Sequence, residues 1–73
     1  MTIEKLPLTT PFITLGQLLK QVAIIGSGGQ AKWYLSESTV YVNGELESRR
    51  GRKLYAGDII LFEAEQLTVE LID

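Results

Sequence analysis

Four of the five residues from Arg49 to Lys53 are cationic, in a 73-residue chain whose formal net charge is -2. Guanidinium groups bind phosphate oxygens through paired hydrogen bonds and stay protonated at physiological pH, so the segment suits a phosphate-bearing ligand. A short basic run can also be a solvated turn, because exposed charges contribute little to stability. A cluster of positive charge in a chain that is negative overall favours an anionic partner for that cluster.

A second candidate anion site is Gly26-Ser27-Gly28-Gly29, at the start of a predicted helix. Free amides at a helix start attract anions, and the helix dipole adds to that attraction. Glycine inside a helix costs about 1 kcal/mol relative to alanine, so the glycines at this helix start call for an explanation. Anion binding by the exposed backbone and close packing between the two helices would each explain them. The segment lacks the G-x-x-x-x-G-K-[ST] form, so nucleotide hydrolysis is not indicated.

Two aromatic residues could stack on a nucleic-acid base. Tyr55 lies just after the basic segment and is the better candidate. Trp33 lies away from the Ala31/Leu35 face of its predicted helix, and two interpretations remain open for it. It could be a stacking platform or, slightly favoured, pack as a lid over the preceding helix.

The residues give little support for catalysis. The chain has no His and no Cys, which removes the commonest general base, the thiolate ligand and the disulfide. Glu45 and Glu47 alternate along one predicted strand and point the same way, which we interpret as a solvated face rather than a catalytic pair. We therefore expect no enzyme, no metal site and no cofactor.

Charge is distributed unevenly along the chain. Residues 14–57 carry six cations and three carboxylates, a net +3, whereas residues 58–73 carry five carboxylates and no cation. A ligand responds mainly to the nearer region, because charges are screened over about 8 Å at physiological salt. The acidic net charge therefore does not argue against a polyanionic partner.

Short elements must position these residues. Residues 2–6 alternate polar and apolar side chains, which predicts an edge strand that ends at Pro7. Residues 14–17 form a capping box that opens a helix with one apolar stripe, and Gly26 can supply its left-handed stop. Residues 27–30 repeat the capping box, so a second helix should follow with almost no linker.

The second half of the chain is predicted to consist of strands joined by turns. Asn43-Gly44 is a strong hairpin signal, and Ala56-Gly57-Asp58 is a further turn that Asp58 should hold. The whole order predicts an α+β domain in which two short helices pack on a small, curled, mainly antiparallel sheet. The strands predicted after the helices span residues 40–42, 45–47, 59–62 and 67–72.

The order of motifs resembles that of the S4 RNA-binding domain. The pattern V-x-V-N-G stands at 40–44, and L-x-x-G-D-x-I stands at 54–60. The start of the second helix, Ser27-x-x-Gln30-Ala31-Lys32, is similar to the S-R-x-E-A-R segment of that family. The SGGQAKW and SRRGRKL segments resemble those of small stand-alone bacterial members. The resemblance spans residues 13 to about 62 of a single domain, residues 1–73.

The resemblance implies the αL RNA-binding fold, in which two helices and a curled strand unit form a surface that grips structured RNA. Many members begin the first helix with R-L-D-K, where this chain has Thr14-Leu15-Gly16-Gln17, and Gly28 and Trp33 stand where Arg is usual. Compared with the usual family pattern, this chain therefore has fewer basic residues on the helices and more in the segment after the hairpin. With Tyr55 added as a stacking residue, the positions implied are Lys20, Gly28, Gln30, Lys32, Arg49, Arg50, Arg52, Lys53 and Tyr55.

These observations predict a non-catalytic protein that binds structured RNA through phosphate contacts. The resemblance implies ribosomal RNA or a ribosomal particle as the partner and a part in large-subunit assembly. We further expect a cytoplasmic monomer with no small-molecule substrate and no membrane contact. The hypothesis requires the cationic groups to share one side and not to be tied up by the chain's own carboxylates.

Two other classes of protein fit parts of the pattern. The alternative is a protein-interaction adaptor whose acidic C-terminal strands pair with a basic partner. A sulfur carrier of the β-grasp class would share the small size and the L-x-x-G-D-x-I segment. Such carriers need a Gly-Gly carboxyl terminus, and this sequence ends Leu71-Ile72-Asp73, so we do not expect that function.

Overall fold

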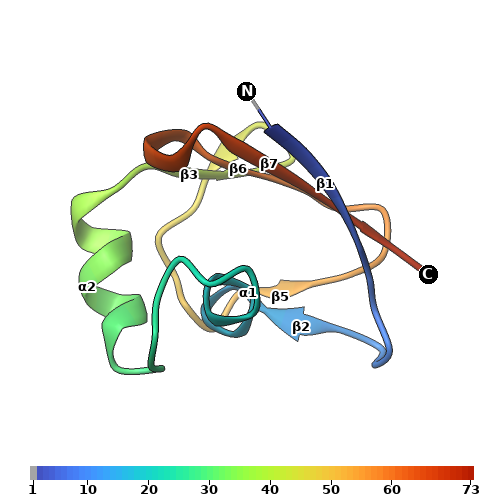
Figure 1. The fold of residues 1–73 in the computed structure, drawn as a ribbon, viewed down its shortest axis with the longest axis horizontal. Coiled ribbons are helices and arrows are strands. Elements are labelled where there is room, and N and C mark those ends of the chain that lie inside the picture. Colours follow the sequence, from blue (N-terminus) through green and yellow to red (C-terminus); the bar gives the residue numbers. More distant parts are fainter. Residues whose placement is uncertain (1) are drawn as a thin grey trace.

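A five-stranded sheet forms one layer of the molecule, and both helices lie on the same side of it (Figure 1). The computed structural model describes residues 2–73. The helices are α1 (Leu15–Gln21), α2 (Gln30–Glu37) and a short 3-10 helix, η1 (Glu63–Glu65). The strands are β1 (Thr2–Pro7), β2 (Ile13–Thr14), β3 (Val40–Val42), β4 (Glu45–Leu46), β5 (Lys53–Leu54), β6 (Ile59–Phe62) and β7 (Leu67–Ile72).

The main sheet has the strand order β1-β7-β6-β3-β4. Strand β1 runs parallel to β7, and the other neighbours are antiparallel, so the predicted α+β class with a mainly antiparallel sheet is confirmed. A second, two-stranded sheet pairs β2 with β5 on the helix side of the molecule (Figure 1). This small sheet was not predicted, because a strand of two residues is too short to show alternation.

Helix α1 begins as predicted and ends earlier than predicted. The Thr14 hydroxyl accepts from the Gln17 amide at 3.2 Å, and the Gln17 side chain accepts from the Thr14 amide at 2.9 Å, which completes the capping box. The predicted stop at Gly26 is wrong. The helix ends at Gln21, and Ala23 adopts the left-handed conformation with φ 64°. A connection of eight residues therefore separates the helices, rather than almost no linker.

The predicted turns join β3, β4 and β6. Asn43 (φ 52°) and Gly44 (φ 84°) both have positive φ, as a type I′ hairpin requires. Asp58 holds its turn as expected: one carboxylate oxygen accepts from the Tyr55 amide at 2.8 Å. The other accepts from the Asn43 side-chain nitrogen at 3.0 Å, which ties the hairpin to the start of β6.

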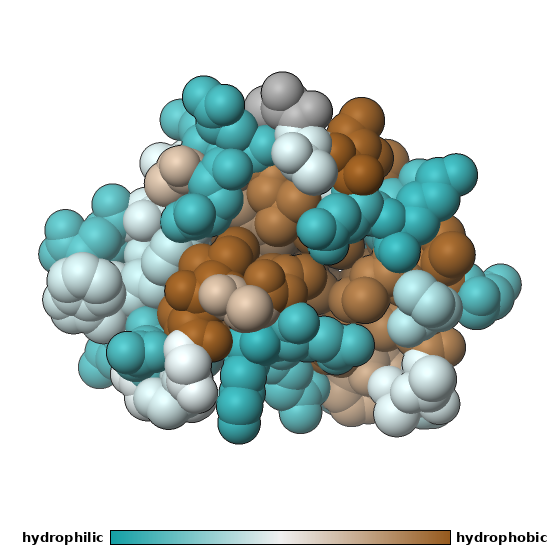
Figure 2. Space-filling model, viewed as in Figure 1, coloured by the Kyte–Doolittle hydropathy of each residue, from teal (hydrophilic) through white to brown (hydrophobic). Residues whose placement is uncertain are grey.

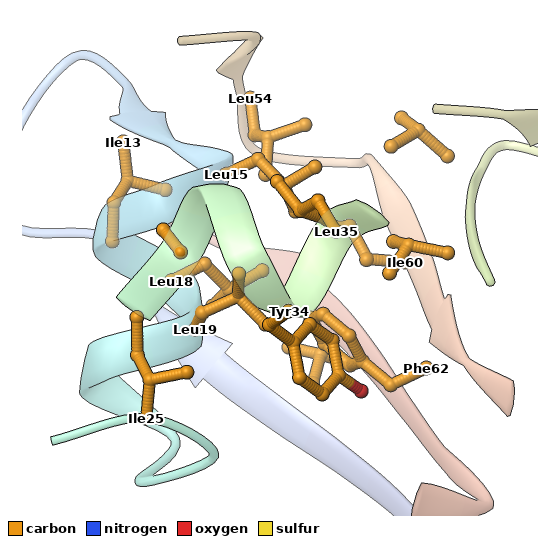
Figure 3. Packing of buried hydrophobic residues seen from close by; sticks show 14 of the residues in the cluster. Ile13, Leu15, Leu18, Leu19, Ile25, Tyr34, Leu35, Leu54, Ile60 and Phe62 are labelled. Carbon is orange, nitrogen blue, oxygen red and sulfur yellow. The ribbon is translucent and has the colours of Figure 1, made fainter. Parts of the chain in front are cut away.

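The core lies between the helices and the inner face of the main sheet. Leu15, Leu18 and Leu19 of α1 are fully buried, at the three-and-four spacing that predicted this stripe. Figure 3 shows these side chains with Tyr34 and Leu35 of α2 and with Ile60 and Phe62 of β6. Figure 2 shows further apolar residues over the segment that follows α1, where Val22 and Ile24 pack against the core. Within residues 2–73, no helix is long and apolar enough to cross a membrane.

Candidate nucleic-acid interface

The basic loop, residues 48–53, follows β4 and runs to the first residue of β5, and a carboxylate beneath it organises it. Glu47 is only 6% exposed. One of its oxygens accepts from the Arg49 backbone amide and from Arg49 Nε, both at 3.0 Å. The other accepts from Arg49 Nη2 at 3.1 Å and from Arg52 Nη1 at 2.6 Å. The hydrogen bond from the Arg49 side chain is the main cause that lowers the pKa of Glu47 from 4.5 to about 2, against the opposing effect of burial.

The interpretation of Glu47 as part of a solvated face is therefore wrong. Glu45 and Glu47 do point the same way, but that direction is inward. The Glu47 amide donates to the carbonyl of Val40, a fully buried residue, and Glu45 pairs with Val42. At the hairpin tip Glu45 stays exposed, whereas Glu47 lies deeper and needs the two guanidinium groups to compensate its burial.

The requirement that the cations stay clear of the chain's own carboxylates is met only in part. Arg49 and Arg52 both pair with Glu47, although the Arg49 side chain remains 75% exposed and that of Arg52 35%. The four cations and Glu47 together still have a net charge of +3. Within the part of the chain that the structure describes, neither Arg50 nor Lys53 forms an ion pair, and both are exposed.

The basic loop is also fixed to the start of α1. The amides of Leu15 and Gly16 donate to the carbonyls of Arg52 (2.9 Å) and Arg50 (2.8 Å). These bonds satisfy donors that a helix start otherwise leaves unpaired. A β-carbon on Gly16 would lie 3.3 Å from the Arg50 carbonyl oxygen and 3.5 Å from the β-carbon of Ala31. The absence of a side chain at Gly16 therefore lets the loop, α1 and the first turn of α2 meet at one point.

The glycine-rich segment before α2 is arranged differently from the prediction. Helix α2 begins at Gln30, and only half of the second capping box forms. The Gln30 side-chain oxygen accepts from the Gly26 amide at 2.7 Å and from the Ser27 amide at 3.3 Å, so these two donors are already occupied. A β-carbon on Gly28 or Gly29 would meet nothing within 4 Å, so close packing does not explain these two glycines.

Three helical residues of interest lie at the surface. Lys20 stands four residues after Gly16, hence on the side of α1 where the loop docks. Lys32 is exposed in the first turn of α2, next to Ala31, which approaches Gly16. Trp33 is 69% exposed, so the slightly favoured packing interpretation is wrong. Ala31, Tyr34 and Leu35 form the buried face of α2, and Trp33 lies off that face.

An aromatic pair flanks the basic loop at its other end. The rings of Phe12 and Tyr55 have centroids 6.1 Å apart, and Lys53 Nζ lies 5.0 Å from the centre of the Phe12 ring. Tyr55 was predicted as a stacking residue, but Phe12 was missed, because only the pairing of β2 with β5 brings the two rings together. A hollow of about 440 Å³ beside Phe12 is lined partly by the polar side chains of Gln17 and Gln21.

The structure thus gathers the predicted residues on the helix side of the molecule, away from the outer face of the main sheet (Figure 1). The loop cations, the start of α2 and the aromatic pair lie next to one another around the start of α1. Fixed guanidinium and ammonium groups beside exposed rings can bind a phosphate backbone and stack on unpaired bases. Among residues 2–73, no group of three or more acidic, His or Cys side chains could hold a metal ion.

Comparisons with known proteins identify the family of the chain. A family model described as "S4 domain" matches residues 6–70, which confirms the resemblance of the motifs. The chain is 59% identical over 54 residues to a Bacillus subtilis protein named "Probable ribosome maturation protein RlbA", covering 74% of this chain and 76% of that protein. It is 36% identical over 59 residues to an Escherichia coli protein named "Putative RNA-binding protein YbcJ", covering 81% and 84%.

Proposed function

Because the chain belongs to the S4 domain family, we propose that it is a non-catalytic protein that binds structured RNA through phosphate contacts. The proposal treats residues 1–73 as a single S4 domain and ribosomal RNA as the target. The name of the 36% identical relative refers to RNA binding, and that of the 59% identical relative to ribosome maturation. No cofactor and no small-molecule substrate are invoked.

The observation that carries the proposal is the fixed conformation of the basic loop. Two backbone hydrogen bonds attach it to α1, and Glu47 orients Arg49 and Arg52 from below. Ordering long side chains on binding costs roughly 0.5–1.5 kcal/mol each, so a loop ordered in advance loses less free energy when it meets a phosphate backbone. A solvated turn would need neither a buried carboxylate nor a docking site on a helix.

Each residue of the proposed surface has a distinct role. Arg50 and Lys53 are the main phosphate contacts, since neither is engaged by a carboxylate of residues 2–73. Arg49 and Arg52 add charge at fixed positions, and Tyr55 stacks on an unpaired base together with Phe12. The contacts from the helices and from the segment before α2 come from Lys20, Gly28, Gln30 and Lys32.

The salt dependence of RNA binding tests the surface directly. With four to six phosphates neutralised, log K against log salt should fall with a slope of about -3 to -5. We expect the double variant Arg50→Ala/Lys53→Ala to flatten that slope by about 1.4–1.8 on a transcribed large-subunit ribosomal RNA, because two phosphates lose their partners. Lys5→Ala is the matched control, since Lys5 lies on β1 in the main sheet. An unchanged slope in the double variant would mean that the loop does not contact the RNA.

We also propose that the protein acts as a monomer in the cytoplasm, on the large ribosomal subunit during its assembly. Sedimentation of a cell lysate tests this part separately. The protein should travel with large-subunit particles or their precursors, and Arg50→Ala/Lys53→Ala should return it to the top of the gradient. Sedimentation with the small subunit alone, or with no particle, would contradict the assignment while leaving RNA binding itself intact.

A further inference from the structure

The hollow of about 440 Å³ beside Phe12 adjoins the aromatic end of the basic loop. Its volume lies in the range of small-ligand pockets, about 300–1,000 Å³, so one nucleobase fits inside it. Phe12 forms one wall, and Gln17 and Gln21, one turn apart on α1, contribute polar side chains. The described residues that line the hollow are all uncharged, so it suits the neutral base of a nucleotide rather than the phosphate.

The segment that carries Phe12 is held in place without a ligand. The Thr10 hydroxyl donates to the Phe12 carbonyl at 2.8 Å, and Pro11 between them has a fixed φ. The pairing of β2 with β5 places Thr14 opposite Lys53, and Lys53 Nζ lies 5.0 Å from the centre of the Phe12 ring. A nucleotide whose base stacks on Phe12 therefore meets a cation that can bind its phosphate.

The side-chain amide of Gln17 has a fixed orientation. Its Oε1 atom accepts from the Thr14 backbone amide at 2.9 Å, as part of the capping box. Because a backbone N–H needs an acceptor, the oxygen faces Thr14 and the NH2 group is left for a ligand. Within residues 2–73 this NH2 group forms no hydrogen bond, so Gln17 offers the hollow a donor in a fixed position. Gln21 is not held by a hydrogen bond from these residues, so it can turn either end of its amide towards a ligand.

We propose that this hollow receives one unpaired base of the bound RNA and prefers guanine or uracil to adenine or cytosine. Guanine and uracil carry a carbonyl oxygen where adenine and cytosine carry an NH2 group, and only the carbonyl oxygen accepts from the NH2 group of Gln17. The inference rests on the proposed RNA binding and deepens it. The basic loop binds phosphates, which carry no sequence information, and the hollow adds a preference for certain bases.

Titration of the isotope-labelled full chain with nucleoside 5′-monophosphates, followed by NMR, tests the preference. GMP should bind about threefold or more tighter than AMP, and UMP about threefold or more tighter than CMP. Comparison within the purines and within the pyrimidines removes the difference in stacking area. The signals of the Gln17 side-chain amide and of the Phe12 ring should shift in each titration. Equal affinities within both pairs, tighter binding of AMP and CMP, or no shift of these signals at millimolar nucleotide would overturn the proposal.

The matched variant is Gln17→Glu. A glutamate at this third helical position still accepts from the Thr14 amide, so the capping box is kept. It replaces the NH2 donor with an acceptor, so the preference should reverse towards AMP and CMP, a change that a purely structural role of Gln17 would not produce. Gln21→Glu adds the same charge one turn further along α1 and should weaken the binding of all four nucleotides without reversing the preference. The same preference in Gln17→Glu as in the wild type would refute the role of the NH2 group.

Stacking is tested by a second variant. Phe12→Leu keeps an apolar side chain and removes the ring, so all four nucleotides should bind about fivefold or more weakly. Unchanged affinities would show that the bases do not lie on Phe12 and would refute the proposed position of the base.

The salt dependence of binding to large-subunit ribosomal RNA separates this inference from the proposed function. If the wild type binds that RNA with a slope of about -3 to -5 but does not discriminate between the nucleotides, only the base preference of the hollow is refuted. Failure to bind the ribosomal RNA at all would instead refute the proposed function, and this inference with it.

Discussion

Replacing Glu47 by glutamine should weaken RNA binding although it makes the basic loop more positive. The glutamine keeps the size of the side chain and one carbonyl acceptor for the backbone amide of Arg49. It loses the charge that holds the guanidinium groups of Arg49 and Arg52, and its own NH2 group would face those donors. The net charge of the four cations and residue 47 rises from +3 to +4, while their geometry becomes less defined.

The effect on stability follows from the pKa of Glu47. Its pKa falls from 4.5 to about 2 on folding, so the ionised carboxylate stabilises the native state. At 1.36 kcal/mol for each pKa unit, this lowering corresponds to roughly 3 kcal/mol of stability at neutral pH. Since the native pKa is the lowered one, this stability is present above about pH 4.5 and is lost as the pH falls towards 2.

Urea unfolding at several pH values measures this contribution. At pH 7 we expect Glu47→Gln to lose roughly 3 kcal/mol of unfolding free energy, and the gap to the wild type should close between pH 4.5 and pH 2. Comparing the two proteins cancels the titration of the other carboxylates. Glu45→Gln, two residues earlier and exposed, should change stability by less than about 0.5 kcal/mol. A gap below about 0.5 kcal/mol at pH 7, or one that does not depend on pH, would refute the role of Glu47.

The RNA affinity of Glu47→Gln distinguishes the effect of the loop's net charge from the effect of its ordered arginine side chains. If net charge alone decided binding, Glu47→Gln would bind more tightly than the wild type. Because the two arginines must now be ordered on binding, at roughly 0.5–1.5 kcal/mol each, we expect affinity to fall about fivefold or more at 150 mM salt. Titration of a labelled ribosomal RNA fragment at fixed salt distinguishes the two outcomes, and tighter binding would remove the argument for a loop ordered in advance.

Two further predictions concern the attachment of the loop and the end of α1. Gly16→Val should lower the free energy of unfolding by about 1–3 kcal/mol and weaken RNA binding, because its side chain would press on the Arg50 carbonyl. Gly51→Val, which has open space around it, should change neither quantity in the same urea and RNA titrations. Ala23→Gly should raise the urea midpoint by the equivalent of about 0.5–1 kcal/mol, since glycine relieves the left-handed strain, whereas Ala56→Gly, whose φ is not positive, should not.

Short sequence motifs correctly predicted the elements that are stabilised by contacts between neighbouring residues. The capping box at residues 14–17 and the Asn43-Gly44 turn each satisfy or orient a backbone within four residues, and both occur where the sequence indicated. The end of α1 shows the limit of such signals. Glycine is the usual left-handed terminator, yet Ala23 takes that conformation, with its amide bonded to the Lys20 carbonyl and the Ile24 amide to the Leu19 carbonyl. Ile24 then packs on the core, and this apolar contact outweighs the local strain.

The candidate site was predictable in its residue types and not in its internal contacts. The crowding of cations at residues 49–53 is visible in the sequence, but the position of Glu47 depends on its pairing with Val40 across the hairpin. The partnership of Phe12 with Tyr55 depends on the β2–β5 pair, which joins segments about forty residues apart. Contacts between distant segments are decided by the assembled fold, so composition and periodicity did not reveal them.

The departure of this chain from the usual first-helix pattern has a structural explanation. Where many S4 domains have an Asp in the first turn of that helix, this chain has Gly16, and the Arg50 carbonyl approaches the helix through the space that a side chain would fill. Gly16 therefore leaves the space in which the charged loop lies against the helix. Arg50 and its neighbours bring positive charge beside the start of α1, where Thr14 and Gln17 carry none. Gly16 and the basic loop thus form one unit, and Gly16→Asp should displace the loop rather than strengthen the surface.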